Sequence, residues 1–241
     1  MSLPPGRAPT LGLSYVSVPV QEPPGNPWFS WRYVQDNADT IIAALREHVT
    51  LTATAVLIAA LVAIPLAVVA YWFRPLTGPI LALSGVLYTI PSLALFAFLG
   101  PYLGIGTKTV LVGLVVYALL VIIRNTLAGL NKVSEEVRDA ARGMGYGRFA
   151  QLLRVDLPLA LPGILTGLRL ATVSTVALTT VGVLVGHGGL GQLILGGFTS
   201  NFYKAQIATG AVLCVALALA LDLVLAGAGR LLTPWTRRRT A

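Results

Sequence analysis

The chain has 241 residues, of which 56% are hydrophobic and only 11% carry a charged side chain. This composition excludes an ordinary water-soluble domain, because such domains contain about 25% charged residues. The net charge of +8 does not indicate nucleic-acid binding, since the basic residues are scattered between apolar segments. The single cysteine, Cys214, excludes an intrachain disulfide and a cysteine-rich metal site.

The first 48 residues are rich in proline and aromatic residues. Residues 1–27 lack apolar periodicity, which predicts a disordered or extended tail without a cleavable signal peptide. A cluster of aromatic residues follows, and then a short amphipathic helix that we expect to be capped by Asp36 or Asn37. Trp and Tyr prefer the membrane interface, so we expect residues 1–48 to form a tail and an interfacial segment.

Long apolar runs follow, and their length predicts membrane-spanning helices. About 20 apolar residues cross a hydrocarbon core of about 30 Å, and the runs lack the alternation of a membrane barrel. The expected spans are 49–72, 76–100, 109–123, 159–185 and 205–229. Pro91 lies inside the second run, where we expect a single kinked helix. The predicted fold is therefore an all-α polytopic membrane protein with about five spans, and a six-helix fold that splits the second run is the alternative.

The lysine and arginine residues near the ends of the spans indicate the orientation. The side with more of them should face the cytoplasm, according to the positive-inside rule. The richer side holds Arg74, Arg124, Lys132, Arg138, Arg142, Arg148, Arg154, Arg230, Arg237, Arg238 and Arg239; the poorer side holds Arg7, Arg32, Arg46, Lys108 and Lys204. This distribution predicts an external N-terminus, a cytoplasmic loop at 131–158 and a cytoplasmic C-terminus with a basic tail at 233–241.

The loop at 131–158 is the longest polar interruption between the apolar segments. Ser134 followed by two glutamates favours a helix start, where carboxylates meet the positive end of the helix dipole. Ala140 and Ala141 keep one surface of this helix small, and Gly145 permits a sharp bend after it. The pattern predicts a helix, a glycine bend and a second helix. An ordinary solvated loop, whose charges only fix the topology, is the alternative.

This loop resembles the coupling loop of bacterial ABC importer permeases. That family shows Glu-Ala-Ala, three residues, Gly, nine residues and then Ile-x-Leu-Pro. The matching positions here are Asp139, Ala140, Ala141, Gly145, Val155, Leu157 and Pro158. Asp139 in place of Glu and Val155 in place of Ile are departures that preserve the chemistry. Further segments are similar to the permeases of osmoprotectant importers for glycine betaine, carnitine, choline or proline. These segments are 90–94, 123–126, 157–162 and 188–191. The whole resemblance covers about 28–232.

The resemblance implies a type I importer in the cell membrane, with this chain as a multi-pass permease subunit whose transmembrane domain is 49–232. It implies three kinds of protein partner, namely cytoplasmic ABC ATPase subunits, a second permease copy or a paralogue, and an extracytoplasmic substrate-binding protein. The lipid bilayer surrounds the permease subunit. ATP hydrolysis would then belong to the partner, since this sequence lacks Gly-x4-Gly-Lys-Ser/Thr. A methionine-type or other small-solute importer is the alternative substrate class. An ion-coupled secondary transporter would need more intramembrane acids.

Two ionisable residues stand inside otherwise apolar spans, namely Arg169 and Asp222. An ionisable group is costly at this depth unless it is paired or functional. We expect the two side chains to pair and to hold the fourth and fifth spans together. Separate snorkelling of each toward water is the alternative.

The remaining candidates concern a gate, a pathway or a metal. Proline and glycine at the second run and before the last span predict gate or pathway positions at Pro91, Ser92, Gly188, Gly189 and Gly191. Aromatic faces attract cationic amines, and the candidates on the expected spans are Tyr88, Phe96, Phe98 and Tyr117, although packing is the simpler interpretation. His48 and His187 lack partners at metal-ligand spacing, so we expect no metal and no cofactor.

Overall fold

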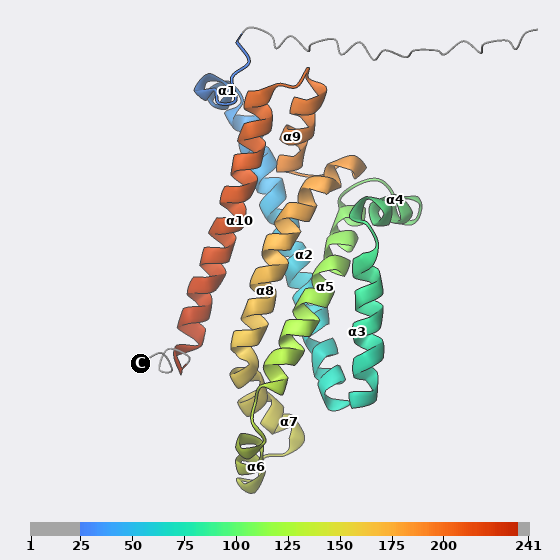
Figure 1. Cartoon of the computed structure of the whole chain (residues 1–241), viewed down its shortest axis with the longest axis vertical. Helices are drawn as coiled ribbons and strands as arrows, with labels where there is room; N and C mark the ends of the chain where they lie inside the picture. Colours follow the sequence, from blue (N-terminus) through green and yellow to red (C-terminus); the bar gives the residue numbers. More distant parts are fainter. Residues whose placement is uncertain (1–24, 236–241) are drawn as a thin grey trace, which may run out of the picture.

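A computed structural model of the chain describes residues 25–235, which form only helices and their connections (Figure 1). Most of the expected N-terminal tail, most of the basic C-terminal tail, and Arg7 and Arg237 to Arg239 lie outside the described residues. Within the described range, four helices are long and apolar enough to cross a membrane, or five if one bent pair counts as a span. This agrees with the prediction of about five spans.

The first span is longer than the sequence predicts. A short helix, α1 (Trp31–Asp36), precedes α2 (Ala38–Trp72), which has 35 residues and therefore a length of about 50 Å. The helix expected before the first span starts where the sequence predicts, after Asn37, but it does not end at His48, because α2 passes through that residue without interruption. The segment from Ala38 to Ile64 contains neither glycine nor proline, so nothing in it breaks the backbone hydrogen bonds.

The second apolar run is divided into α3 (Arg74–Thr89) and α4 (Ser92–Leu103), whose axes differ by 96°. The prediction of a single kinked helix is therefore wrong, and the alternative that splits this run is closer to the geometry. Pro91 has no N–H, and its ring disfavours a helical conformation at Ile90, which is extended with ψ 126°. The hydroxyl of Tyr117 donates a hydrogen bond to the Ile90 carbonyl and satisfies one acceptor at the break.

Three helices form the centre of the bundle: α2, α5 (Thr107–Asn131) and α8 (Leu157–Thr179) (Figure 1). A stripe of fully buried alanines on α2 faces Ile122 and Ile123 of α5. Small residues let α5 and α8 approach closely as well, since a Cβ added to Gly163 would lie 2.7 Å from the Cα of Gly129. This close packing makes the three helices one body.

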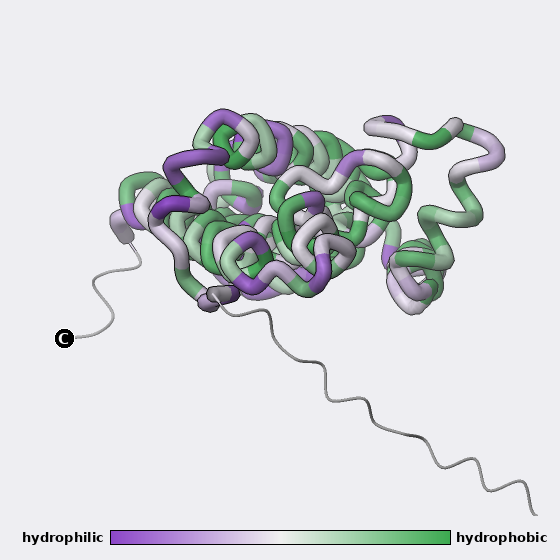
Figure 2. Tube along the Cα trace, turned by 90° about the horizontal axis from the view of Figure 1, so that it is seen from above, coloured by the Kyte–Doolittle hydropathy of each residue, from purple (hydrophilic) through white to green (hydrophobic). Residues whose placement is uncertain are grey.

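The remaining helices lie around this centre. A 3-10 segment (Thr180–Val185) continues α8 and leads through a glycine-rich turn to α9 (Leu190–Thr199) and then to α10 (Lys204–Leu232). Side chains on the outer surface of α10 are apolar and exposed, including Val215, Leu219 and Leu223. Figure 2, a view from above, shows hydrophobic segments on the outside of the bundle too. Such a surface suits lipid and not water.

Candidate functional site

The polar loop forms two short helices at one end of the bundle, α6 (Glu135–Gly143) and α7 (Arg148–Gln151) (Figure 1). The bend between them is at Gly145, whose φ of +85° favours glycine, and its N–H donates to the Arg142 carbonyl at 2.9 Å. A π-helical turn (Leu152–Asp156) then leads into α8. The predicted helix, glycine bend and second helix are thus all present in the structure.

The motif residues divide into an exposed and a buried group. Asp139 and Ala140 are exposed, whereas Ala141 faces inward and is 1% exposed. Val155, Leu157 and Pro158 are half-buried at the start of α8. One part of the motif is therefore available to a partner, while the other is packed against the membrane helices.

A row of charged side chains follows the exposed side of α6. Arg142 donates to Glu135 at 2.5 Å and also to Asp139, and these two hydrogen bonds raise the pKa of the Arg142 guanidinium. Hydrogen bonds from the Ser134 hydroxyl and from its own backbone N–H hold the pKa of Glu136 below the ordinary value. Exposed pairs of this kind contribute little stability, so the row orders the surface of α6 more than it stabilises the fold.

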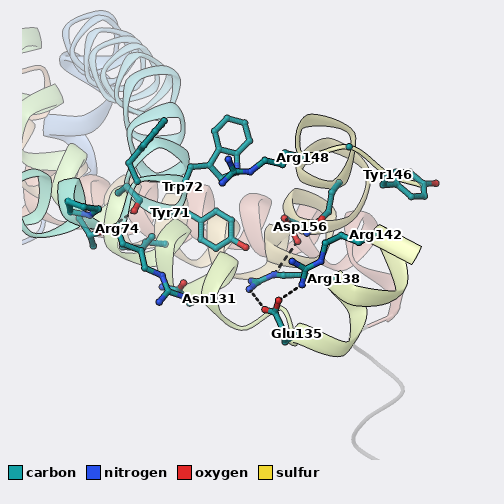
Figure 3. Close-up of a pocket in the computed structure, with 17 residues that line it drawn as sticks. Tyr71, Trp72, Arg74, Asn131, Glu135, Arg138, Arg142, Tyr146, Arg148 and Asp156 are labelled. Carbon is teal, nitrogen blue, oxygen red and sulfur yellow. Dashed lines mark hydrogen bonds and ion pairs between the residues drawn. The ribbon is translucent and has the colours of Figure 1, made fainter. Parts of the chain in front are cut away.

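Arg138 connects α6 to three membrane helices (Figure 3). Its Nη2 donates to the Leu130 carbonyl at the end of α5, at 2.8 Å. Its Nε lies 3.6 Å from Oδ1 of the buried Asp156, just before α8. The guanidinium also lies over the ring of Tyr71 near the end of α2, 5.1 Å from the ring centroid. A displacement of α6 would therefore be transmitted to α2, α5 and α8.

This cluster of Arg138, Asp156 and Tyr71 is absent from the sequence-based candidates. Two signals in the sequence point to it. Arg138 directly precedes Asp139, and Asp156 is a carboxylate set between the apolar motif positions Val155 and Leu157. A charged residue inside an apolar motif usually has a partner, because burying an unpaired charge is costly.

The structure brings together Arg169 on α8 and Asp222 on α10. The guanidinium and the carboxylate form two parallel hydrogen bonds, of 2.8 Å from Nε and 2.7 Å from Nη2. The two side chains therefore pair directly and do not extend separately toward water. The pair joins the outer helix α10 to the central helix α8.

The glycines at 188, 189 and 191 lie at the start of α9, in the half of the bundle away from α6 (Figure 1). A Cβ on Gly189, which has φ +51°, would lie 2.7 Å from the Cβ of His48 on α2. His48 is fully buried, accepts a hydrogen bond from the Leu190 N–H at 3.2 Å on Nδ1, and donates from Nε2 to the Val176 carbonyl at 3.0 Å. These partners define a neutral imidazole, which joins α2, α8 and α9.

The other candidates do not converge on one site. Pro91 and Ser92 lie at the break between α3 and α4, and Phe96 of α4 is buried against Val185, just before the glycines. Of the four aromatic candidates, Tyr88 and Tyr117 are in edge-to-face contact with centroids 5.8 Å apart. Phe98 is exposed and contacts Tyr102 instead. The aromatic residues therefore form no common cage in the described part of the chain.

The bundle and its polar loop define a class of protein, the multi-pass membrane subunits of transport systems. The chain belongs to the family described as the binding-protein-dependent transport system inner membrane component, whose model matches residues 55–238. This match confirms the family resemblance seen in the loop and places the chain in the inner membrane.

Several characterised relatives are similar to the chain over most of their length. The choline transport system permease protein OpuBD of Bacillus subtilis is 36% identical, over 86% of this chain and 92% of that protein. The glycine betaine/carnitine/choline transport system permease protein OpuCD of Bacillus subtilis is 36% identical, over 86% and 90%. The osmoprotectant import permease protein OsmW of Salmonella typhimurium is 34% identical, over 84% and 96%.

A solved structure has the same fold. An inward-facing structure of the MetNI methionine ABC transporter matches with a TM-score of 0.76 over 85% of this chain and 100% of that chain. The sequence identity is 23%, so this likeness concerns the fold alone.

Proposed function

We propose that this chain is the permease subunit of an ATP-driven importer and that a separate ATPase binds α6. The observation that carries this proposal is the surface of the polar loop. Several apolar side chains are exposed there, among them Val137 at 40%, Met144 at 70% and Phe149 at 66%. Exposed apolar side chains rimmed by charges are typical of protein–protein contacts. We call these three residues the docking face.

In this proposal, α6 acts as a lever on the membrane helices. The ATPase pushes or pulls the helix that carries Asp139 and Ala140 when it closes around ATP. Arg138 transmits this movement, because it contacts Leu130, Asp156 and Tyr71 on three different helices. The helices of the bundle then tilt as a body between inward-open and outward-open states.

The orientation in this proposal follows from charge. The loop at 131–158 faces the cytoplasm and the N-terminus lies outside, since Arg74, Lys132 and Arg148 accompany α6 at one end of the bundle. The transmembrane domain is 49–232, and residues 38–48 extend its first helix. The C-terminal tail at 233–241 is then cytoplasmic.

The proposed substrate is a small quaternary amine. Support comes from relatives whose names state choline, glycine betaine or carnitine, at identities of 33–37% over most of the chain. A second permease copy or a paralogue completes the pathway, and an extracytoplasmic binding protein delivers the substrate. The likeness to a methionine transporter extends to the fold only and therefore does not favour methionine.

Uptake into vesicles tests this proposal. The chain is reconstituted with its ATPase, its permease partner and its binding protein, and uptake of labelled choline, glycine betaine and carnitine is measured. We expect uptake that requires both ATP and the binding protein. Uptake that continues without ATP and follows an ion gradient would contradict the proposal and favour a secondary transporter.

A further inference from the structure

A cavity of about 1040 Å³ lies between the connection of α2 to α3, the end of α5 and the α6–α7 loop (Figure 3). It opens at the level where the membrane helices end. Tyr71 and Trp72, at the end of α2, line one side, and such aromatic residues are common at the height of the lipid headgroups. The cavity is thus positioned where the membrane surface and the loop meet.

The cavity carries excess positive charge. Arg74, Arg138, Arg142 and Arg148 line it, against only two acids, Glu135 and Asp156. Arg138 and Arg142 form ion pairs with these acids or with Asp139. Arg74 and Arg148 are exposed and form no ion pair within residues 25–235. Two guanidinium groups from different segments are therefore available to an anion.

One donor in this cavity lacks an acceptor. Nε of Arg138 is buried and has no hydrogen-bond partner among the described residues. The nearest carboxylate oxygen, Oδ1 of Asp156, is likewise without a hydrogen bond, at 3.6 Å from Nε, which is beyond hydrogen-bond distance. Nε of Arg138 is thus held near Asp156 by charge and not by a hydrogen bond. A small movement of the guanidinium toward the cavity would let it donate to an oxygen atom of a bound anion.

We propose that the cavity binds the phosphate group of an anionic ligand. A guanidinium donates two parallel hydrogen bonds to a phosphate, and several guanidinium groups arranged around one cavity suit its tetrahedral oxygens. A basic pocket at the cytoplasmic ends of membrane helices suits a lipid headgroup in particular. The same chemistry would also accept a soluble phosphate compound, so the experiment distinguishes the two sources.

The proposed ligand would regulate the lever, and this part rests on the proposed function. Arg138 both lines the cavity and holds α6 against the membrane helices. An anion bound beside Arg138 would fix the position of α6 relative to α2 and α8. Coupling between the ATPase and the pathway would then depend on the anion.

Binding is measured by calorimetry on the purified full chain in detergent, without an ATPase. The probes are dihexanoyl phosphatidylglycerol, dihexanoyl phosphatidylcholine, inorganic phosphate and ATP. The pocket variant is Arg74→Gln with Arg148→Gln. The matched control, Arg32→Gln with Arg46→Gln, removes the same charge from exposed residues before and within α2, toward the other end of the bundle. Thermal unfolding shows whether each variant is folded.

We expect saturable binding of phosphatidylglycerol and no binding of phosphatidylcholine. The affinity should fall about tenfold or more in the pocket variant, because charge-assisted hydrogen bonds are lost, and should stay within about twofold in the control. Binding of phosphatidylglycerol alone identifies a lipid headgroup, while competition by phosphate or ATP identifies a soluble ligand.

Three results would overturn the proposal: no saturable binding, equal binding of phosphatidylcholine, or equal weakening in both variants. A different result would assign the arginines to the protein partner: the natural chain binds none of the probes, and the pocket variant no longer associates with the ATPase. Because no ATPase is present in the binding experiment, its failure leaves the proposed transport function intact.

Discussion

Arg169 on α8 and Asp222 on α10 form a bidentate ion pair, with N–O distances of 2.8 and 2.7 Å. The two residues are 53 positions apart in the chain. α10 otherwise presents a largely exposed apolar surface, so this pair is a specific link that fixes its rotation against α8. Either residue alone would be a charged group within an apolar span, which is costly.

This pair gives the first prediction. Arg169→Asp and Asp222→Arg should each lower the thermal stability and the yield of the membrane protein, because each places like charges opposite one another. The double exchange should restore both quantities, since it recreates the pair with the charges reversed. Thermal unfolding in detergent measures the effect. Single exchanges without any effect, or a double exchange without rescue, would show that the pair is dispensable.

The second prediction concerns the bend after α6. Gly145→Val should uncouple ATP hydrolysis from uptake, because a residue with a Cβ is strained at φ +85° by about 1–2 kcal/mol. A Cβ at this position meets no atom within 4 Å, so the effect comes from the backbone and not from a clash. Gly143→Val is the matched control, since that glycine also has free space but no positive φ.

Hydrolysis and uptake are measured together in reconstituted vesicles. The Gly145 variant should retain hydrolysis and lose most of its uptake, whereas the Gly143 variant should keep both in proportion. If both variants transport as well as the natural protein, the bend has no part in coupling.

The third prediction concerns Arg138. Arg138→Met should destabilise the loop by about 3 kcal/mol, because it leaves the buried Asp156 without its cation. Uptake for each ATP hydrolysed should fall at the same time. Arg154→Met removes an exposed arginine from the π-helical turn and serves as the control.

Hydrogen exchange of α6 measures this change locally. Faster exchange in the Arg138 variant, and unchanged exchange in the Arg154 variant, is the expected result. Arg138→Lys should be intermediate, since lysine keeps the charge but loses the fork of donors. Equal exchange rates in all these proteins would mean that Arg138 does not hold α6 in place.

The fourth prediction concerns the other end of the bundle. Gly189→Ala should lower stability by about 2 kcal/mol or more, from backbone strain and from overlap with His48. Gly227→Ala, where a Cβ meets no atom within 4 Å, should leave stability equal or slightly higher. Denaturation of the detergent-solubilised chain distinguishes the two. An equal response of both glycines would argue against the contact between Gly189 and His48.

The sequence predicts local features of this fold well and contacts across the bundle poorly. Apolar length locates the spans, and the position of Gly145 locates the bend, because both depend on neighbouring residues. The break at Pro91 shows a limit, since a membrane proline either kinks or ends a helix and its neighbours in space decide which. Here Tyr117, from another helix, supplies the donor at the break.

The cluster around Arg138 shows the same limit at the functional site. Tyr71 approaches Arg138 from a distant helix and Asp156 from beyond the α6–α7 bend, and no periodicity predicts either contact. The buried His48 is similar, because its two hydrogen-bond partners are more than 120 residues away. By contrast, two charges within apolar spans have few possible partners, so Arg169 and Asp222 could be paired from the sequence.

Labelling of α6 with and without the ATPase tests the central claim most directly. Met144→Cys is introduced together with Cys214→Ala, and Leu231→Cys at the exposed end of α10, beyond the expected span, serves as the control. Inside-out and right-side-out vesicles are treated with a membrane-impermeant maleimide. We predict labelling at positions 144 and 231 only in inside-out vesicles, with protection by the bound ATPase at position 144 and no such protection at position 231. Labelling from the outside, or no protection by the ATPase, would contradict the account.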